Sequence, residues 1–305
     1  MLSPQHNWPA LAIPLLPCIL AIGGSNDLPS TTYSSTVSEV RISFFVTDEH
    51  NRSVETVNKE DFAVVDNERV VRNFRSFSRS DETALDLVAV VDVSESVAPG
   101  FQSAMQDVLQ LVSQGQPVSD DSISVLSFRG IHPAVICSGN CRGSAAESRL
   151  LALHAAGTTP LFDTLAFGAD FIAHRRAAGV KPVLILFSDG NDTVSRTSAG
   201  DALEAIIASN ALIYTVDLSN PENPSDGSGV LRQISEATGG RYFRIREGAA
   251  NVLQAVIEDL HASYVVTYQL PNHRRGFHSL RILPTHNLQL RFHCRNGYSY
   301  ENSIR

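Results

Sequence analysis

Between residues 85 and 260 the chain alternates continuous apolar runs with stretches of helical length. The apolar runs read DLVAVVD, SISVLSF, PVLILFSDG and ALIYTVD, and HPAVIC is expected as an edge strand. Continuous apolar strands are typical of a parallel sheet that is covered on both faces. Helices are expected at residues 100–113, 147–155, 160–176, 199–210, 230–237 and 249–260. The predicted fold class is therefore α/β, with a doubly wound, mostly parallel sheet and right-handed crossovers.

The two flanks of this segment are rich in β-structure instead. Residues 37–77 alternate short strand-like runs with turn signals, including a hairpin turn at Asp66-Asn67, and residues 263–300 contain three more strand-like runs. We expect one small β domain built from both flanks, with the α/β domain inserted between them. The expected divisions are a signal peptide at 1–24, a linker at 25–36, an N-terminal β region at 37–80, the α/β domain at 81–262 and a C-terminal β region at 263–305.

An apolar stretch near the start of the sequence, LAIPLLPCILAI at residues 11–22, is too short to span a bilayer and contains two prolines. It resembles the apolar region of a signal peptide, and Ala21 and Gly23 are small residues that suit a cleavage site, although no Lys or Arg precedes them. This pattern predicts a secreted or envelope (periplasmic) protein with no integral membrane span. The alternatives are a misassigned start codon and a buried apolar strand.

The four cysteines are too few for a disulfide scaffold in a chain of 305 residues, and their spacing matches no zinc pattern. Cys137 and Cys141, in CSGNC, are close enough in sequence to form a small loop disulfide in an oxidising compartment. Two free thiols in a loop are the alternative.

Charge is distributed unevenly along the chain. The formal net charge is −8, and residues 81–240 contain 19 acidic against 8 basic side chains. An acidic centre suits a cation and repels nucleic acid. Arg241, Arg244 and Arg246 alternate along one strand and are expected on the sheet surface. Exposed strand positions are expected for four C-terminal histidines, His273, His278, His286 and His293.

Polar residues follow the apolar strands at the edge where open α/β sheets bind ligands. Asp92 ends the first strand and begins the pattern D-x-S-x-S with Ser94 and Ser96, and Asp189 follows the third apolar run. Thr159 stands before a proline that is expected to open a helix, with Thr159 as its N-cap. Each of these residues alone is also explained as a cap or turn residue. Their order and their strand-end positions together predict a shared metal site.

Three hydroxyls and two carboxylates are a ligand set that suits a hard divalent cation. Mg²⁺ takes about six oxygen ligands and usually keeps several waters. If the hydroxyls bind directly and the carboxylates act largely through water, the ion keeps most of its positive charge. A carboxylate presented by a partner can then fill the remaining position, with no catalytic base required.

Three segments, DLVAVVDVSES, GTTPLFDTL and LILFSDGND, resemble the parts of the metal-ion-dependent adhesion site of von Willebrand factor A domains. The resemblance covers roughly residues 84–262. It implies that Mg²⁺ (or Mn²⁺) is bound by five residues that all match the motif, Asp92, Ser94, Ser96, Thr159 and Asp189. The flanking segments VTDEHNRSVETVNKEDFAVVDNERVVRNF, SYVVTYQL and RNGYSY resemble the bacterial VWFA-related domain found widely in Acidobacteria, which implies a secreted or envelope-associated protein.

The sequence thus predicts a non-enzymatic, adhesion-type module whose ion captures an Asp or Glu side chain of a protein partner. It contains no G-x-x-x-x-G-K-[ST], no G-x-G-x-x-G after a strand, no G-x-S-x-G and no H-E-x-x-H. A metal-dependent hydrolase that uses the same pocket is one alternative. A structural envelope module, in which the ion only stiffens the loops, is another. The sequence predicts neither the partner nor the oligomeric state.

Overall fold

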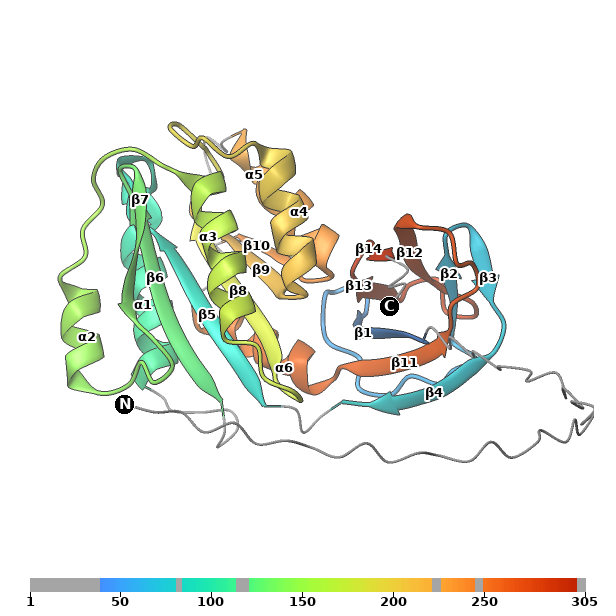
Figure 1. Ribbon diagram of the computed structural model, residues 1–305. Coiled ribbons are helices and arrows are strands. Elements are labelled where there is room, and N and C mark those ends of the chain that lie inside the picture. Colours follow the sequence, from blue (N-terminus) through green and yellow to red (C-terminus); the bar gives the residue numbers. More distant parts are fainter. Residues whose placement is uncertain (1–38, 81–83, 114–120, 221–225, 245–248, 301–305) are drawn as a thin grey trace, which may run out of the picture. The chain divides into compact units, whose positions relative to one another are not determined.

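A computed structural model of the protein describes residues 39–80, 84–113, 121–220, 226–244 and 249–300. A six-stranded sheet has the order β10-β9-β8-β5-β6-β7 (Figure 1). Its strands are β5 (Leu85–Asp92), β6 (Ser122–Arg129), β7 (His132–Cys137), β8 (Lys181–Ser188), β9 (Leu212–Asp217) and β10 (Tyr242–Arg244). All neighbouring pairs are parallel except β6 with β7. The predicted mostly parallel sheet is confirmed, with HPAVIC as an antiparallel edge strand.

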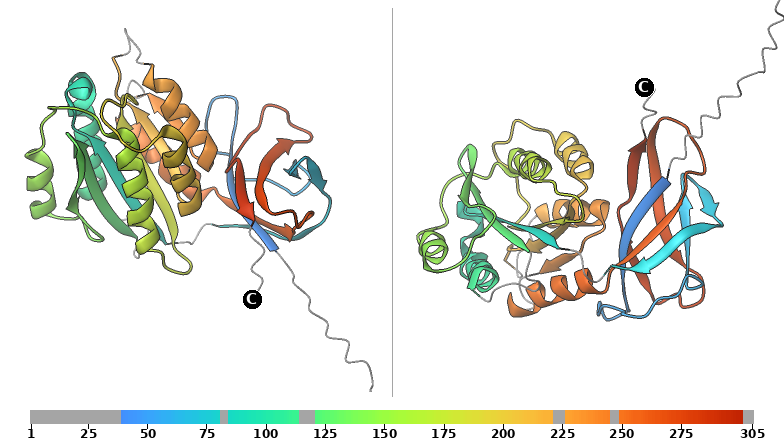
Figure 2. Two further views of the ribbon diagram at one scale, coloured as in Figure 1. Left: turned by 45° about the horizontal axis from the view of Figure 1, so that its top comes forward. Right: turned by 60° about the horizontal axis from the view of Figure 1, so that its bottom comes forward.

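Helices cover both faces of this sheet (Figure 2). They are α1 (Ala98–Ser113), α2 (Ser144–Leu151) and α6 (Ala249–His261) on one face, and α3 (Leu161–His174), α4 (Ala199–Ser209) and α5 (Gly227–Thr238) on the other. In β5, Leu87, Ala89 and Val91 face the first layer, whereas Val88 and Val90 face the second. Every residue of β5 is buried as a result, which explains why its residues 87–91 are apolar without alternation.

The start of α3 differs from the expectation in a way that affects the site. Pro160, not Thr159, occupies the N-cap position, and it makes no side-chain cap. The amides of the second and third residues of α3 donate instead to Asp192 Oδ1 (3.3 Å) and Ser195 Oγ (3.1 Å). Because a distant segment caps this helix, the Thr159 hydroxyl has no capping role.

The two flanks combine into two four-stranded sheets, with the orders β13-β1-β11-β4 and β14-β12-β2-β3. Their strands are β1 (Glu39–Thr47), β2 (Phe62–Asp66), β3 (Arg69–Val71), β4 (Phe74–Arg79), β11 (Tyr264–Gln269), β12 (Gly276–Pro284), β13 (Arg291–Cys294) and β14 (Gly297–Tyr300). Strands from before and after the α/β segment pair directly, β1 with β11 and β2 with β12. The predicted insertion of the α/β domain between the flanks is confirmed, and β14 adds a fourth strand to the three expected after it.

The β sheets enclose an aromatic core. Phe44, Phe62 and Phe77 form a cluster with centroid distances of 5.1–6.3 Å, and Tyr264 stacks on two of them. The residue-level domain divisions stay a prediction. The expected signal peptide and linker lie outside the described residues.

Two expectations about exposed residues are wrong, and the expected hairpin turn is displaced by one residue. The β2–β3 hairpin is present, but its turn residues are Asn67 and Glu68, which have positive φ angles, and Asp66 is the last residue of β2. Asp66 is instead buried and accepts hydrogen bonds from two tyrosine hydroxyls, with His278 Nδ1 3.3 Å away. His278 is only 1% exposed, because this buried carboxylate and a backbone carbonyl satisfy its ring. Arg241 is also buried rather than on the sheet surface, because it forms an ion pair with Asp259.

Cys137 and Cys141 form a disulfide bond, so the bridged alternative is the one observed. Cys294 is a free, partly buried thiol. Within the described part of the chain, no helix is long and apolar enough to cross a membrane.

Candidate functional site

Three loops that carry the predicted ligands lie at one edge of the α/β sheet. We refer to residues 92–97 as the first loop, 156–160 as the second and 188–193 as the third. The first follows β5 and the third follows β8, and these strands are parallel neighbours. Their carboxyl ends therefore bring the two loops to the same edge.

The first loop folds around the carboxylate of Asp92. The Ser94 amide donates to Asp92 Oδ1 at 2.9 Å, and the Ser94 and Ser96 hydroxyls lie 3.1 Å apart. A short 3-10 helix (Glu95–Val97) then leads directly into α1. Asp92 and Ser94 are fully buried, whereas Ser96 is exposed, so the two hydroxyls run from the interior towards the surface.

Backbone hydrogen bonds tie the second loop to both of the others. The Glu95 amide donates to the Gly157 carbonyl at 3.0 Å. The Thr159 amide donates to the Thr193 hydroxyl at 2.8 Å, and the Thr193 amide donates to the Thr159 carbonyl at 2.9 Å. The position of Thr159 is therefore set by the third loop rather than by the helix that follows it.

The third loop is joined to the first through Ser188, whose hydroxyl donates to Asp92 Oδ2 at 2.7 Å. Asp189 accepts from the amide and the side-chain nitrogen of Asn191, at 3.1 and 3.0 Å. The turn requires glycine at position 190, because φ is +78° and a Cβ there would lie 2.2 Å from the Gly227 carbonyl oxygen.

Electrostatics at this edge favour a cation. Burial, with a smaller contribution from the neighbouring Asp189, raises the pKa of Asp92 to about 6 against the opposing effect of hydrogen bonds from Ser94 and Ser188. No basic side chain is among these causes. A positive ion between the loops would therefore relieve the cost of burying one carboxylate beside another.

The donor set fits a divalent cation that prefers oxygen ligands better than a metal that prefers nitrogen or sulfur ligands. Among the described residues, no group of three or more His, Cys, Asp or Glu side chains is arranged to hold a metal. A metal here would depend on hydroxyls, two carboxylates and water, as Mg²⁺ or Mn²⁺ does and Zn²⁺ rarely does. The Thr159 hydroxyl makes no hydrogen bond to the described part of the chain, although the residue is only 2% exposed.

The structure links the five predicted ligands unequally. Hydrogen bonds connect Asp92, Ser94 and Ser96. The negative charge of Asp189 contributes to the raised pKa of Asp92. No direct hydrogen bond within the described residues joins the Thr159 side chain to the other four.

Sequence reasoning missed the residues that hold the loops together. Ser188 orients Asp92, Asn191 orients Asp189, and Thr193 fixes the second loop. Ser188 and Asn191 lie inside the segment LILFSDGND. Their polar side chains, just before and two residues after Asp189, were the sequence feature that could have indicated their role. Thr193 gave no signal, because its role depends on contact with a loop that lies 34 residues earlier.

Comparison with protein families gives one match. The model of the von Willebrand factor type A domain matches residues 86–259, more than half of the chain. Two curated relatives are the Magnesium-chelatase 67 kDa subunits of Chlorobaculum parvum and Chlorobaculum tepidum, each 23% identical over 185 residues. The aligned region covers 56% of this chain and 30% of each relative, so the chain spans less than a third of their length.

Three solved structures are similar to part of the chain. An aerotolerance-related membrane protein from Bacteroides fragilis is 13% identical with a TM-score of 0.44, over 58% of this chain and 98% of that one. BatB from Bacteroides thetaiotaomicron is 13% identical with a TM-score of 0.42, over 57% and 97%. A D319A mutant of the PilB minor pilin from Streptococcus sanguinis is 10% identical with a TM-score of 0.44, over 59% and 63%.

Proposed function

Because this chain belongs to the von Willebrand factor type A domain family, we propose that it is a non-enzymatic, metal-dependent module that binds a protein partner. The family match supports a protein-interaction or metal-dependent module in general. The ligands that we propose are the five residues identified from the sequence, Asp92, Ser94, Ser96, Thr159 and Asp189.

Neutral hydroxyls next to the ion would keep it electrophilic. Ser94, Ser96 and Thr159 would bind directly, while the two carboxylates would act largely through water. When bound, Mg²⁺ or Mn²⁺ supplies a positive centre with an open position for an oxygen ligand. An Asp or Glu side chain of the partner would occupy that position, so partner binding would be bridged by the metal.

The observation that carries this proposal is the environment of Asp92. It is fully buried, it is hydrogen-bonded from both the first and the third loop, and no basic side chain of the described residues is paired with it. Buried carboxylates are normally paired with a cation or coordinate a metal. A divalent ion at this position would supply the missing charge.

The disulfide supports an extracytoplasmic location. Bonds such as Cys137–Cys141 form and persist in oxidising compartments and are rare in the cytosol. We therefore place the proposed partner outside the cytoplasm, in the envelope or on secreted material.

A hydrolase that uses the same pocket has less support. A serine nucleophile needs a neighbouring base, and no histidine within the described residues is hydrogen-bonded to Ser94 or Ser96. His154, from the segment before the second loop, contacts Arg129 instead.

Calorimetry tests the metal site directly. MgCl₂ and MnCl₂ are titrated into the wild-type protein, into Asp92→Ala and into Asp170→Asn, a control that changes an exposed carboxylate in α3. We expect saturable binding by the wild type and the control, and at least about tenfold weaker binding by Asp92→Ala. Absence of heat for both metals in the wild type would overturn the proposal.

Affinity capture then distinguishes an ion that mediates partner binding from an ion that only stiffens the loops. The immobilised wild type and the two variants are incubated with an envelope extract in Mg²⁺ and eluted with a chelator. We expect chelator-released proteins from the wild type and Asp170→Asn, and none from Asp92→Ala. If metal raises the melting temperature but the captured proteins do not depend on it, the ion only stiffens the loops.

A further inference from the structure

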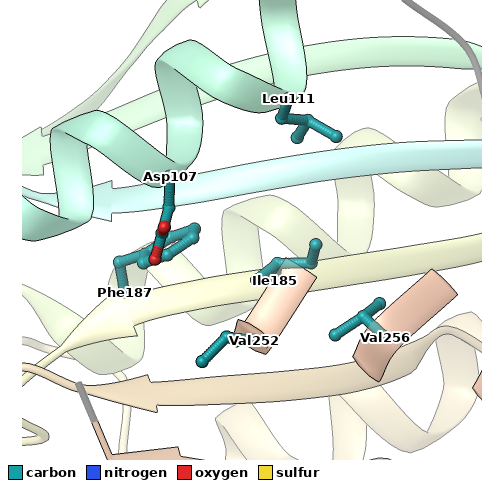
Figure 3. Close-up of a pocket in the computed structure, with 6 residues that line it drawn as sticks. All are labelled: Asp107, Leu111, Ile185, Phe187, Val252 and Val256. Carbon is teal, nitrogen blue, oxygen red and sulfur yellow. The ribbon is translucent and has the colours of Figure 1, made fainter. Parts of the chain in front are cut away.

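Asp107 is a buried acid in α1, the helix that follows the first loop, and it belongs to none of the three metal loops. It lies in the third turn of α1, its exposed fraction is 3%, and neither carboxylate oxygen has a hydrogen-bond partner among the described residues. Figure 3 shows the carboxylate pointing from α1 towards Phe187 of β8. A charge in this position would be costly, so the group requires a physical explanation.

The carboxylate faces a small apolar cavity between α1, β8 and α6. The other lining residues are Leu111, Ile185, Phe187, Val252 and Val256. The cavity volume is about 10 Å³, which is barely enough for one water. That water would find one polar partner here, whereas buried waters usually have about three. An organic amine or a hydrated cation would not fit, so the species that the site accommodates is a proton.

The described elements around Asp107 present no charged group to it. The ionisable residue of β8, Lys181, lies at the opposite end of the strand and donates to Ser263 Oγ at 2.7 Å. On this face of β9 the titratable residue is Tyr214, which is placed beside Asp259. The ionisable residues of α6 follow Val256 in its last turns, and they are Glu258, Asp259 and His261.

We propose that Asp107 is a proton-operated latch between α1 and α6. While Asp107 is protonated, α6 packs fully against α1. When the proton is lost, the carboxylate becomes hydrated only if the Val252 and Val256 side of α6 moves away from α1. This latch does not depend on the proposed metal site.

The difference between the pKa of Asp107 in the packed state and in the opened state determines how strongly pH changes the open population of α6. Burial raises the pKa of Asp107 from 3.8 to about 7 in the packed state. If an opened α6 returns the carboxyl to its ordinary pKa, packing is favoured most at low pH and weakens as pH rises from about 4 to about 7. Between about pH 5.5 and about pH 8.5 the open population should rise about 30-fold.

The opening should be confined to part of α6. Its last turn is anchored, because Asp259 accepts from Arg241 at 2.8 Å and from the Ser53 hydroxyl at 2.6 Å. The helix then continues into β11 after only two residues. We therefore expect the turns around Val252 and Val256 to loosen while the turn around Asp259 stays in place.

Hydrogen exchange read by mass spectrometry tests the latch on the full chain. Protection factors, corrected for the intrinsic pH dependence of exchange, are measured for amides in residues 252–257 and 258–263 at about pH 5.5 and about pH 8.5. The wild type is compared with Asp107→Asn, a near-isosteric and non-ionisable variant, and with the exposed control Asp170→Asn. Asp107→Val provides a second non-ionisable variant if the first fails to fold.

We expect protection of residues 252–257 to fall about 30-fold between the two pH values in the wild type and in Asp170→Asn. In the Asp107 variants, protection of residues 252–257 should change by less than about threefold between the two pH values. Protection of residues 258–263 in the wild type should also change by less than about threefold. Equal wild-type protection at both pH values would overturn the proposal. An undiminished pH response in a folded Asp107 variant would overturn it as well.

Discussion

Replacing Arg241 with methionine should destabilise the fold by about 3–5 kcal/mol. Arg241 and Asp259 are 9% and 0% exposed, and the guanidinium Nη1 lies 2.8 and 3.1 Å from the two carboxylate oxygens. Methionine keeps much of the volume of the stem and removes both hydrogen bonds. The Ser53 hydroxyl would be the one hydrogen-bond donor left to Asp259 within the described structure.

The magnitude follows from these contacts. Each hydrogen bond to a charged group contributes about 1.5–3 kcal/mol, so two such bonds account for about 3–6 kcal/mol. Burial already raises the pKa of Asp259 to about 6 while Arg241 opposes the rise. Without Arg241 that pKa rises further, so the carboxyl takes up a proton more readily in the folded state. The loss of stability should therefore be smaller at pH 5 than at pH 8.

Urea unfolding followed by circular dichroism at both pH values measures the effect. Arg281→Met, which changes an exposed arginine on β12, is the matched control and should shift stability by less than about 0.5 kcal/mol. The double variant Arg241→Met with Asp259→Leu should recover much of the loss, because no charge is then left buried. A loss below about 1 kcal/mol in Arg241→Met, or the same loss at both pH values, would refute this reasoning.

Three further outcomes are expected. Saturating Mg²⁺ should stabilise the wild type by about 2.7 kcal/mol at a hundred times the dissociation constant, and should not stabilise Asp92→Ala; differential scanning fluorimetry checks both. Cys141→Ser opens a disulfide that spans four residues and should cost about 2 kcal/mol in urea unfolding under non-reducing conditions, a difference that a reductant should abolish. Gly190→Ala should cost at least about 2 kcal/mol and weaken Mg²⁺ binding in calorimetry, because its Cβ would clash with the Gly227 carbonyl; unchanged stability would show that the turn can relax.

The architecture could be predicted because local signals agreed with the global fold. The central residues of β5 and β8 are buried on both faces of the sheet, so each strand contains a continuous apolar run, and such runs predict a parallel sheet with helices on both sides. Asp92 and Asp189 end or follow these strands, and strand topology then brings their loops together. Thr159 joined the same set through its position before Pro160, between these two strands in the sequence, and the resemblance to a known family implied the same five residues.

The failures concern residues whose environment is created by distant parts of the chain. His278 and Arg241 look like surface residues, because nothing nearby in sequence shows that Asp66 and Asp259 satisfy them inside the protein. The cap of α3 comes from residues about 30 positions later, so the N-cap rule applied to Thr159 failed. In the sequence Asp107 looks like an ordinary polar residue of an amphipathic helix, and only its packing against β8 and α6 reveals that it has no hydrogen-bond partner among the described residues.

The chain enters and leaves the α/β domain through two neighbouring strands, β4 and β11. Arg79 lies opposite Tyr264 in their antiparallel ladder, and the next amide, of Ser80, donates to the Ser263 carbonyl at 2.8 Å. Tension on the α/β domain would therefore reach β4 and β11 from the same end and in the same direction, so these two strands would not slide past each other. The force would act instead on the backbone hydrogen bonds between β11 and β1, and it would load them in shear.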